Sequence, residues 1–236
     1  MCKHRLHNSQ QKKRSQSYPF RNAALSFVTG GDVHAVAEQI LSICENYPAP
    51  ALNCAMNFLS THDTERAITA IAGEPANGRD RYWQSGRRIP AEKMDDAMRK
   101  LLLGYAMIFT LPGVPCIYYG DEIAMQGYRD PFNRAFFRWD AHEQRLRPVL
   151  AQLAQLRHTC EAFRTGQLRV LRAEDGILHY QRVGKVETAE IIVNRTEHII
   201  VETLASGKST EVNPMGFTIV VEEVGHNPNH SYYDYV

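Results

Sequence analysis

Apolar residues recur at helical spacing in three stretches of the chain, and each stretch predicts an amphipathic helix. The three stretches are residues 33–44, 91–110 and 143–163. Asp32 stands directly before the first stretch, where a short carboxylate side chain suits the N-cap position. Two prolines, at positions 48 and 50, follow the same stretch and end that helix.

Two mostly apolar runs lie between these helices and predict buried strands. The first run covers residues 52–60 and the second covers residues 114–119. Strands that alternate with helices are typical of β/α units, in which consecutive strands are usually parallel neighbours. We therefore expect the two runs to pair in parallel within one sheet.

The pattern changes after Gly166, where short β-rich runs are separated by turn residues such as Asp175-Gly176 and Asn194. This alternation predicts a small antiparallel sandwich over residues 166–224. Residues 225–236 are expected to form a disordered tail. The β-rich runs are 168–171, 177–180, 190–193, 198–201 and 217–221.

Residues 1–17 differ from the rest of the chain because they carry five Lys and Arg residues and no acid. A basic arm of this kind can bind nucleic acid. The change in composition at Tyr18 is abrupt, however, and favours a disordered head or translation from a wrong start or frame.

Composition narrows the class of protein only slightly. The 236 residues are 44% hydrophobic and 22% charged, which is enough to build a core, and the formal charge of +1 gives no attraction to nucleic acid or membrane. No apolar run approaches the roughly 20 residues of a membrane span. Five scattered cysteines lack the spacing of a metal site, so we expect no cofactor, no metal and a cytoplasmic location.

Polar, ionisable residues follow both predicted strands. His62 and Asp63 come after the first strand, whereas Asp121 and Glu122 come after the second. A carboxylate such as Asp63 can hold two adjacent hydroxyl groups of a ligand while a neighbouring imidazole donates to another. A His-Asp pair by itself is more often a capped turn, so the position after a buried strand is what favours a functional role. Because both follow the C-terminal ends of strands, we expect Asp63 and the 130–134 loop to open on the same rim.

The segments 57–66 (Asn-Phe-Leu-Ser-Thr-His-Asp-Thr-Glu-Arg) and 111–122 (Leu-Pro-Gly-Val-Pro-Cys-Ile-Tyr-Tyr-Gly-Asp-Glu) closely resemble the last two strand-loop units of the α-amylase family. This is glycoside hydrolase family 13, and the similarity is to its neopullulanase and cyclomaltodextrinase branch. The resemblance covers about residues 18–224. It implies an α/β fold in which residues 18–165 are the C-terminal part of a (β/α)8 TIM barrel, followed by a small all-β sandwich domain at 166–224.

The resemblance also implies roles for individual residues. Asp63 matches the family's transition-state stabiliser, and His62 matches a residue that binds the sugar. Asp130 and Arg134 resemble a substrate-binding pair, for which the alternative is a surface salt bridge. Asp121 and Glu122 match a structural landmark, and adjacent residues on one loop cannot flank a single glycosidic bond. Five aromatic residues either stack on sugars or pack at the rim: Trp83, Phe132, Phe136, Phe137 and Trp139.

The implied function is that of a retaining glycoside hydrolase acting on α-1,4 glucosidic bonds of α-glucans, maltooligosaccharides or cyclodextrins, with α-1,6 bonds left open. Nothing in the chain matches the family's nucleophile or general acid, so this chain alone is expected to be inactive. The alternative is a non-catalytic carbohydrate-binding or regulatory remnant. The family resemblance implies homodimers for complete members. The near-neutral charge and the lack of a long apolar run argue against a nucleic-acid or membrane partner.

Overall fold

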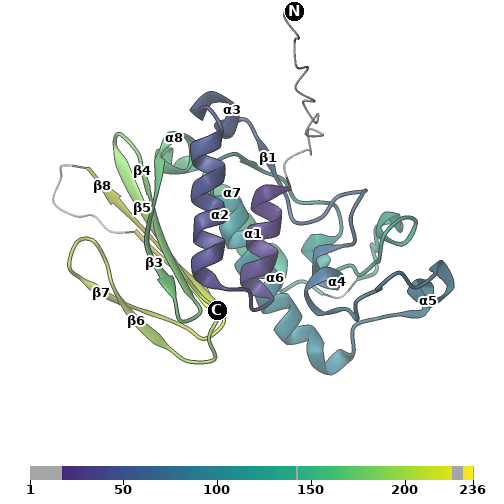
Figure 1. Ribbon diagram of the computed structural model, residues 1–236. Helices are drawn as coiled ribbons and strands as arrows, with labels where there is room; N and C mark the ends of the chain where they lie inside the picture. The colour runs from purple at the N-terminus through teal and green to yellow at the C-terminus, as the bar shows by residue number, and fades with distance from the viewer. Residues whose placement is uncertain (1–17, 142, 225–230, 236) are drawn as a thin grey trace, which may run out of the picture.

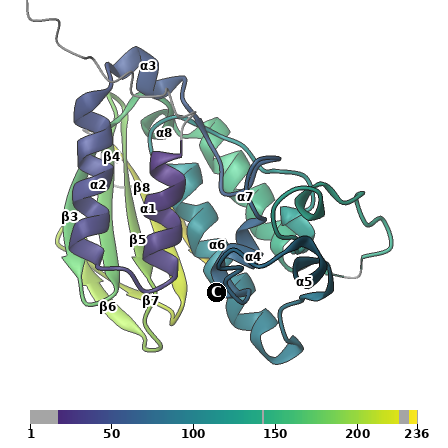
Figure 2. The same ribbon diagram turned by 45° about the vertical axis from the view of Figure 1, so that its right-hand side comes forward.

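The computed structural model describes residues 18–141, 143–224 and 231–235 of the chain. The basic head at 1–17 and residues 225–230 and 236 of the expected tail lie outside the described residues. An antiparallel sheet covers one side of a central group of helices, and short helices with long loops lie on the other side (Figures 1 and 2).

Two of the predicted helices form as expected. Helix α2 (Val33–Asn46) begins where the Asp32 carboxylate accepts a hydrogen bond from the backbone N–H of Ala35 at 2.7 Å. Helix α6 (Ala91–Thr110) has the predicted bounds and is buried over most of its second half. The remaining helices are α1 (Pro19–Val28), α3 (Ala49–Asn53), α4 (Ala67–Ala72), α5 (Arg81–Gly86), α7 (Leu146–Thr159) and α8 (Glu161–Thr165), with 3-10 turns η1 (Asp121–Ile123) and η2 (Phe132–Arg134).

The single helix predicted over residues 143–163 is wrong in its extent. The structure divides it into α7 and α8 at Cys160, whose backbone is extended with φ −79° and ψ 120°. Periodicity alone did not show the break because the apolar spacing continues across it to buried Ala162 and Phe163.

The prediction of a parallel pair is confirmed, although the paired region is short and residues 52 and 53, expected in the first strand, belong to α3. Strand β1 (Met56–Asn57) pairs in parallel with β2 (Val114–Pro115), and Met56 lies opposite Val114. Gly113 has a φ of 116°, and a Cβ there would lie 2.5 Å from the carbonyl oxygen of Ala55. Glycine therefore permits the close approach of the two strands.

The C-terminal region is a five-stranded antiparallel sheet and a separate two-stranded hairpin. The sheet order is β3-β4-β5-β8-β9, and β9 (Ser231–Tyr235) corrects the expectation of a disordered tail over those five residues. The other sheet strands are β3 (Gln167–Glu174), β4 (Ile177–Val183), β5 (Glu187–Asn194) and β8 (Gly216–Glu223), and the hairpin is β6 (Ile200–Thr203) with β7 (Ser209–Val212). Strand β7 has no signal in the sequence, because Ser-Thr-Glu-Val contains no apolar run.

Both faces of the five-stranded sheet are covered. One face shares the main core with the helices through residues such as Tyr180 and Ile191, and the opposite face packs Ile192 and Val220 against the hairpin. Arg182 reaches from the sheet to the helices, and its guanidinium donates to the carbonyls of Thr110, at 2.6 Å, and other residues. These contacts fix the sheet against the end of α6, and β2 begins four residues after that helix ends.

None of the helices in the described ranges is long and apolar enough to cross a membrane. The same ranges contain no group of three His, Cys, Asp or Glu side chains placed to hold a metal ion.

Candidate functional site

The loop that follows β1 presents His62 and Asp63 to solvent. Thr61 and Thr64 close a tight turn around them: the Thr61 N–H donates to the Thr64 hydroxyl and the Asp63 N–H donates to the Thr61 hydroxyl, each at 3.1 Å. The side chains of His62 and Asp63 are 63% and 50% exposed. The turn therefore leaves both functional groups free to meet a ligand.

The four predicted site residues lie together, and one of them, Arg134, contacts the other three. Its Nε lies 3.1 Å from Asp130 Oδ1, and its Nη2 lies 3.8 Å from Asp63 Oδ1. The same Nε donates to the carbonyl of His62, whose Nε2 is 3.3 Å from Asp63 Oδ1. The expectation that Asp63 and the 130–134 loop open on the same rim is confirmed.

The ion pairs of this cluster are half exposed, so they contribute little to the stability of the fold. Arg134 is 48% exposed and its two carboxylate partners are 50% and 52% exposed. Such pairs can open and exchange their bonds for the hydroxyl groups of a ligand at small cost. The cluster offers carboxylate acceptors, guanidinium donors and one imidazole within a few ångströms, a combination suited to a polyhydroxylated ligand.

Asn133 connects the two loops, and no pattern in the sequence marks it as a site residue. Its side chain is fully buried, and Nδ2 donates to the carbonyls of Thr61, His62 and Thr64 at 3.3, 2.8 and 2.6 Å. One amide group thereby holds the turn that carries His62 and Asp63. Asn133 lies in the segment Asp130-Pro-Phe-Asn-Arg134, which contains two predicted site residues. An asparagine in a polar loop, however, gives no indication of burial.

Replacing Asn133 with Ala is expected to lower the free energy of unfolding by about 1–3 kcal/mol, since it removes three hydrogen bonds made by a fully buried amide group. Amide exchange at residues 61–64 should accelerate. Urea denaturation and hydrogen–deuterium exchange would measure the two effects. Asn46→Ala is the matched control, because that exposed amide bonds only within its own helix and the change should stay within about 0.5 kcal/mol. Equal protection of residues 61–64 in wild type and Asn133→Ala would contradict the positioning role.

A buried charge network lies beneath the cluster and joins the ends of the two strands. Arg66 and Asp121 are 0% and 1% exposed, and Arg66 Nη1 lies 3.6 Å from Asp121 Oδ1. Arg66 Nη1 also donates to the carbonyl of Tyr119 at 2.6 Å, and the Tyr105 hydroxyl donates to Asp121 Oδ2 at 2.5 Å. Gly120, with φ 89°, leaves room for this guanidinium, because a Cβ there would lie 2.9 Å from Arg66 Nη1.

The network gives Asp121 and Glu122 structural roles. Burial raises the pKa of the Asp121 carboxyl from 3.8 to about 6, although hydrogen bonds from Ser60 and Tyr105 and the charge of Arg66 oppose the shift. A raised pKa suits a catalytic acid, but this carboxyl is enclosed and cannot reach a substrate. Glu122 bends back so that its Oε2 accepts from the N–H of Gly120 at 2.7 Å. Neither carboxyl is aimed at the cluster around Arg134.

Comparison with known proteins identifies the class. No family model matches the chain. A cyclomaltodextrinase from Geobacillus thermopakistaniensis (strain MAS1) is 33% identical over 186 residues, which cover 76% of this chain and 28% of that protein. An amylopullulanase from Thermoanaerobacter thermohydrosulfuricus is 30% identical over 178 residues, covering 70% of this chain and 12% of that protein.

The solved structures agree with the sequence relatives. The ligand-free cyclic α-maltosyl-(1→6)-maltose hydrolase from Arthrobacter globiformis superposes with a TM-score of 0.73 at 25% identity, over 89% of this chain and 44% of that one. The chain is thus related to the glycoside hydrolases. Its relatives are those of the α-amylase family, glycoside hydrolase family 13, in the cyclomaltodextrinase and neopullulanase branch. It spans less than a third of the length of the curated relatives named here, at 28% and 12%.

Proposed function

We propose that this chain is a part of an α-glucan-acting, retaining glycoside hydrolase of the neopullulanase, cyclomaltodextrinase or α-amylase type. In this proposal residues 18–165 are the C-terminal portion of a (β/α)8 barrel and residues 166–224 are the β-sandwich domain that follows it. The parallel pair of β1 and β2, separated along the chain by α6, supports the barrel portion. The antiparallel sheet with its covering hairpin supports the second domain.

The convergence of His62, Asp63, Asp130 and Arg134 is the observation that carries the proposal. We assign Asp63 to stabilise the positive charge that develops on the sugar ring, and His62, Asp130 and Arg134 to bind sugar hydroxyls. Arg134 lies between the two carboxylates and holds them on the same side of the site. A carboxylate in the place of Asp63 can stabilise a positively charged transition state.

We also propose that this chain alone lacks the nucleophile and the general acid. Retaining hydrolysis needs those two carboxyl groups about 5–5.5 Å apart across the scissile bond. Asp121 is enclosed and Glu122 is bonded to Gly120, so neither supplies the pair. The assigned residues bind and stabilise, but none of them donates a proton to the leaving oxygen.

Binding of maltotriose to the purified chain tests the site. Wild type is expected to bind weakly, and Arg134→Ala should weaken binding on the order of tenfold or more, because charge-assisted hydrogen bonds are each worth about 1.5–3 kcal/mol. Isothermal titration calorimetry would measure the affinity. Asp96→Asn is a control, since that exposed carboxylate pairs with Lys100 on α6 away from the loops. Undiminished binding by Arg134→Ala would contradict the assignment.

The second candidate is a non-catalytic carbohydrate-binding or regulatory remnant that uses the same surface. The observation in its favour is that the four site residues lie together, whereas the Asp121 carboxyl is enclosed and the Glu122 carboxyl is bonded to Gly120. The genomic DNA just upstream of codon 18 distinguishes the two candidates. A continuation, in frame or after a single frameshift, that encodes the nucleophile and acid loops would support the enzyme.

We place the protein in the cytoplasm, supported by the free thiols of Cys44, Cys54, Cys116 and Cys160. We further propose that a complete enzyme containing this part is a homodimer, as the family resemblance implies.

A further inference from the structure

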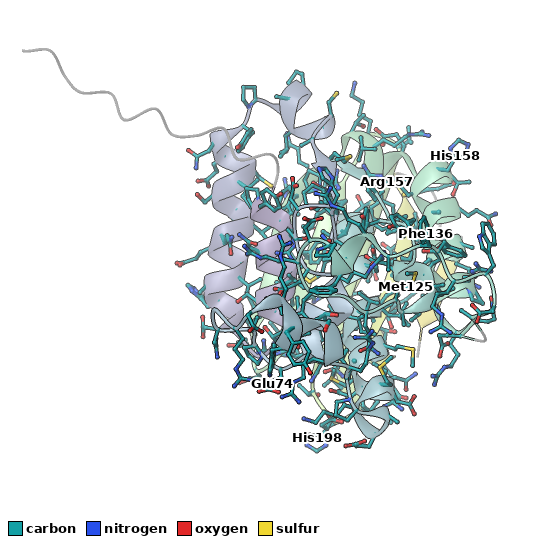
Figure 3. All side chains as sticks on the ribbon, turned by 90° about the vertical axis from the view of Figure 1, so that its right-hand side faces the viewer. Glu74, Met125, Phe136, Arg157, His158 and His198 are labelled. Atoms are coloured by element: carbon teal, nitrogen blue, oxygen red, sulfur yellow. The ribbon has the colours of Figure 1, made fainter. Side chains whose placement is uncertain are left out.

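A pocket of about 470 Å³ lies beside the candidate site, between the segment after β2 and the segment that leads to α7. This volume is within the range of small-molecule sites. Ile123, Ala124 and Met125, all less than 8% exposed, supply an apolar base. Met125 and Phe136, which both line the pocket, are labelled near one another on the face shown in Figure 3.

The charged side chains of the pocket balance one another. Arg88 and Arg138 supply two positive charges, and Asp140 and Glu143 supply two negative charges. Arg138 Nη2 lies 3.4 Å from Asp140 Oδ2. The described lining residues thus offer both donors and acceptors, and their formal charges cancel, which favours a neutral ligand rich in hydroxyl groups over an ion.

Glu143 remains a charged acceptor. Its carboxylate receives hydrogen bonds from Arg145 Nε at 3.0 Å and Nη2 at 2.7 Å. These bonds hold the pKa of Glu143 below its ordinary value. The wall therefore keeps an ionised acceptor at neutral pH.

Two aromatic side chains stand exposed around this pocket. Phe136, which lines it, is 96% exposed, and Trp139, between the lining residues Arg138 and Asp140, is 89% exposed. The rings of Trp139 and Phe137 have centroids 4.7 Å apart, and this contact supports the indole. Exposed aromatic faces of this kind mark contact surfaces. Their planar faces also suit the apolar C–H faces of a pyranose ring.

The pocket is continuous with the candidate site along the chain. Ala135, part of its lining, follows Arg134 directly, and the Tyr119 hydroxyl donates to the Ala135 carbonyl at 2.8 Å. This bond attaches the start of the aromatic loop to the segment after β2. Phe136, the next residue of the pocket lining, follows Ala135 directly.

We propose that this pocket is a second saccharide-binding site, which takes the glucose units of an α-glucan that extend beyond the cluster around Arg134. It makes the chain prefer long α-glucans over short ones. This inference rests on the proposed function. The mixed-charge lining and concave shape favour a saccharide over a protein partner, for which a flat apolar patch is more typical.

Calorimetric titration with maltotriose and maltoheptaose tests the inference on wild type, Phe136→Ala and Tyr82→Ala. Tyr82 is the matched control because it is 88% exposed and lies on α5, outside the pocket lining. Wild type should bind maltoheptaose more tightly than maltotriose. Phe136→Ala should lose this preference through a drop on the order of tenfold in maltoheptaose affinity, with maltotriose affinity unchanged. Tyr82→Ala should behave as wild type.

Fluorescence locates the binding. The chain has two tryptophans, so Trp83→Phe leaves Trp139 as the sole reporter, and maltoheptaose should change its emission where maltotriose does not. A length preference that survives in Phe136→Ala, or no preference in wild type, would overturn the inference. If either outcome occurred while Arg134→Ala still lost maltotriose binding, the proposed function would stand without the second saccharide-binding site. Wild type that binds neither glucan would overturn both. Self-association removed by Phe136→Ala, without any length preference, would show a protein interface instead.

Discussion

The purified chain is expected not to hydrolyse starch, pullulan or cyclodextrins at a rate near that of a complete enzyme. Asp63 can stabilise charge, but the proposal gives it no partner to protonate the leaving oxygen or to form the glycosyl intermediate. General acid catalysis alone is typically worth about 10² to 10⁴ in rate. Loss of the covalent route compounds the deficit, because residues that act as a unit fail together.

Release of reducing sugar should be measured with wild type and Asp63→Asn in parallel, since a contaminating host amylase would be unaffected by the substitution. Robust activity in wild type that disappears in Asp63→Asn would contradict the proposed catalytic inventory. Glu65 would then be the first carboxyl to examine, because Asp121 is buried and Glu122 is bonded to Gly120.

Replacing Arg66 with Met is expected to cost roughly 3–5 kcal/mol in the free energy of unfolding, as when one partner of a buried ion pair is removed. Arg66 also packs its guanidinium 5.0 and 4.8 Å from the ring centroids of Tyr118 and Tyr119. The substitution removes both contacts and leaves the Asp121 carboxylate without its cation. Chemical denaturation at pH 5 and pH 8 would measure the loss.

The deficit of Arg66→Met should grow with pH. In wild type the pKa of Asp121 is raised to about 6, so this group contributes stability that is complete below the unfolded pKa near 3.8 and is lost as the pH rises through 6. Without Arg66 the pKa of Asp121 rises further. At a pH above that pKa, the folded protein has to hold an ionised carboxylate that has no cationic partner. At pH 5 Asp121 is largely protonated in both proteins, so their free energies of unfolding differ less than at pH 8.

Lys100→Met provides the control. The pair between Lys100 and Asp96, at 2.7 Å, is an exposed i,i+4 contact on α6, so its removal should cost about 0.3–0.5 kcal/mol. A loss of that small size for Arg66→Met, or a deficit equal at both pH values, would show that the buried network does not hold the strand ends together.

The amino-acid sequence by itself determined the features that depend on local patterns. Helical periodicity and the Asp32 cap placed α2, and periodicity placed α6, because a one-sided apolar stripe and an N-cap need only nearby residues. The alternation of strand and helix predicted the parallel pairing of β1 with β2. The position of His62, Asp63, Asp130 and Arg134 after those strands predicted that they would meet on one rim.

Only the tertiary structure decided which polar residues are buried and what they hold. Asn133 and Arg66 read as ordinary polar loop residues, yet each is fully enclosed, and Asn133 bonds to carbonyls about 70 positions away in the chain. The sequence left two roles open for Phe136, stacking on a sugar or packing, and the fold leaves its ring exposed beside an apolar floor made by Ile123 and Met125. Burial depends on which distant segments pack together, and that packing is a property of the assembled chain, which no local pattern of residues encodes.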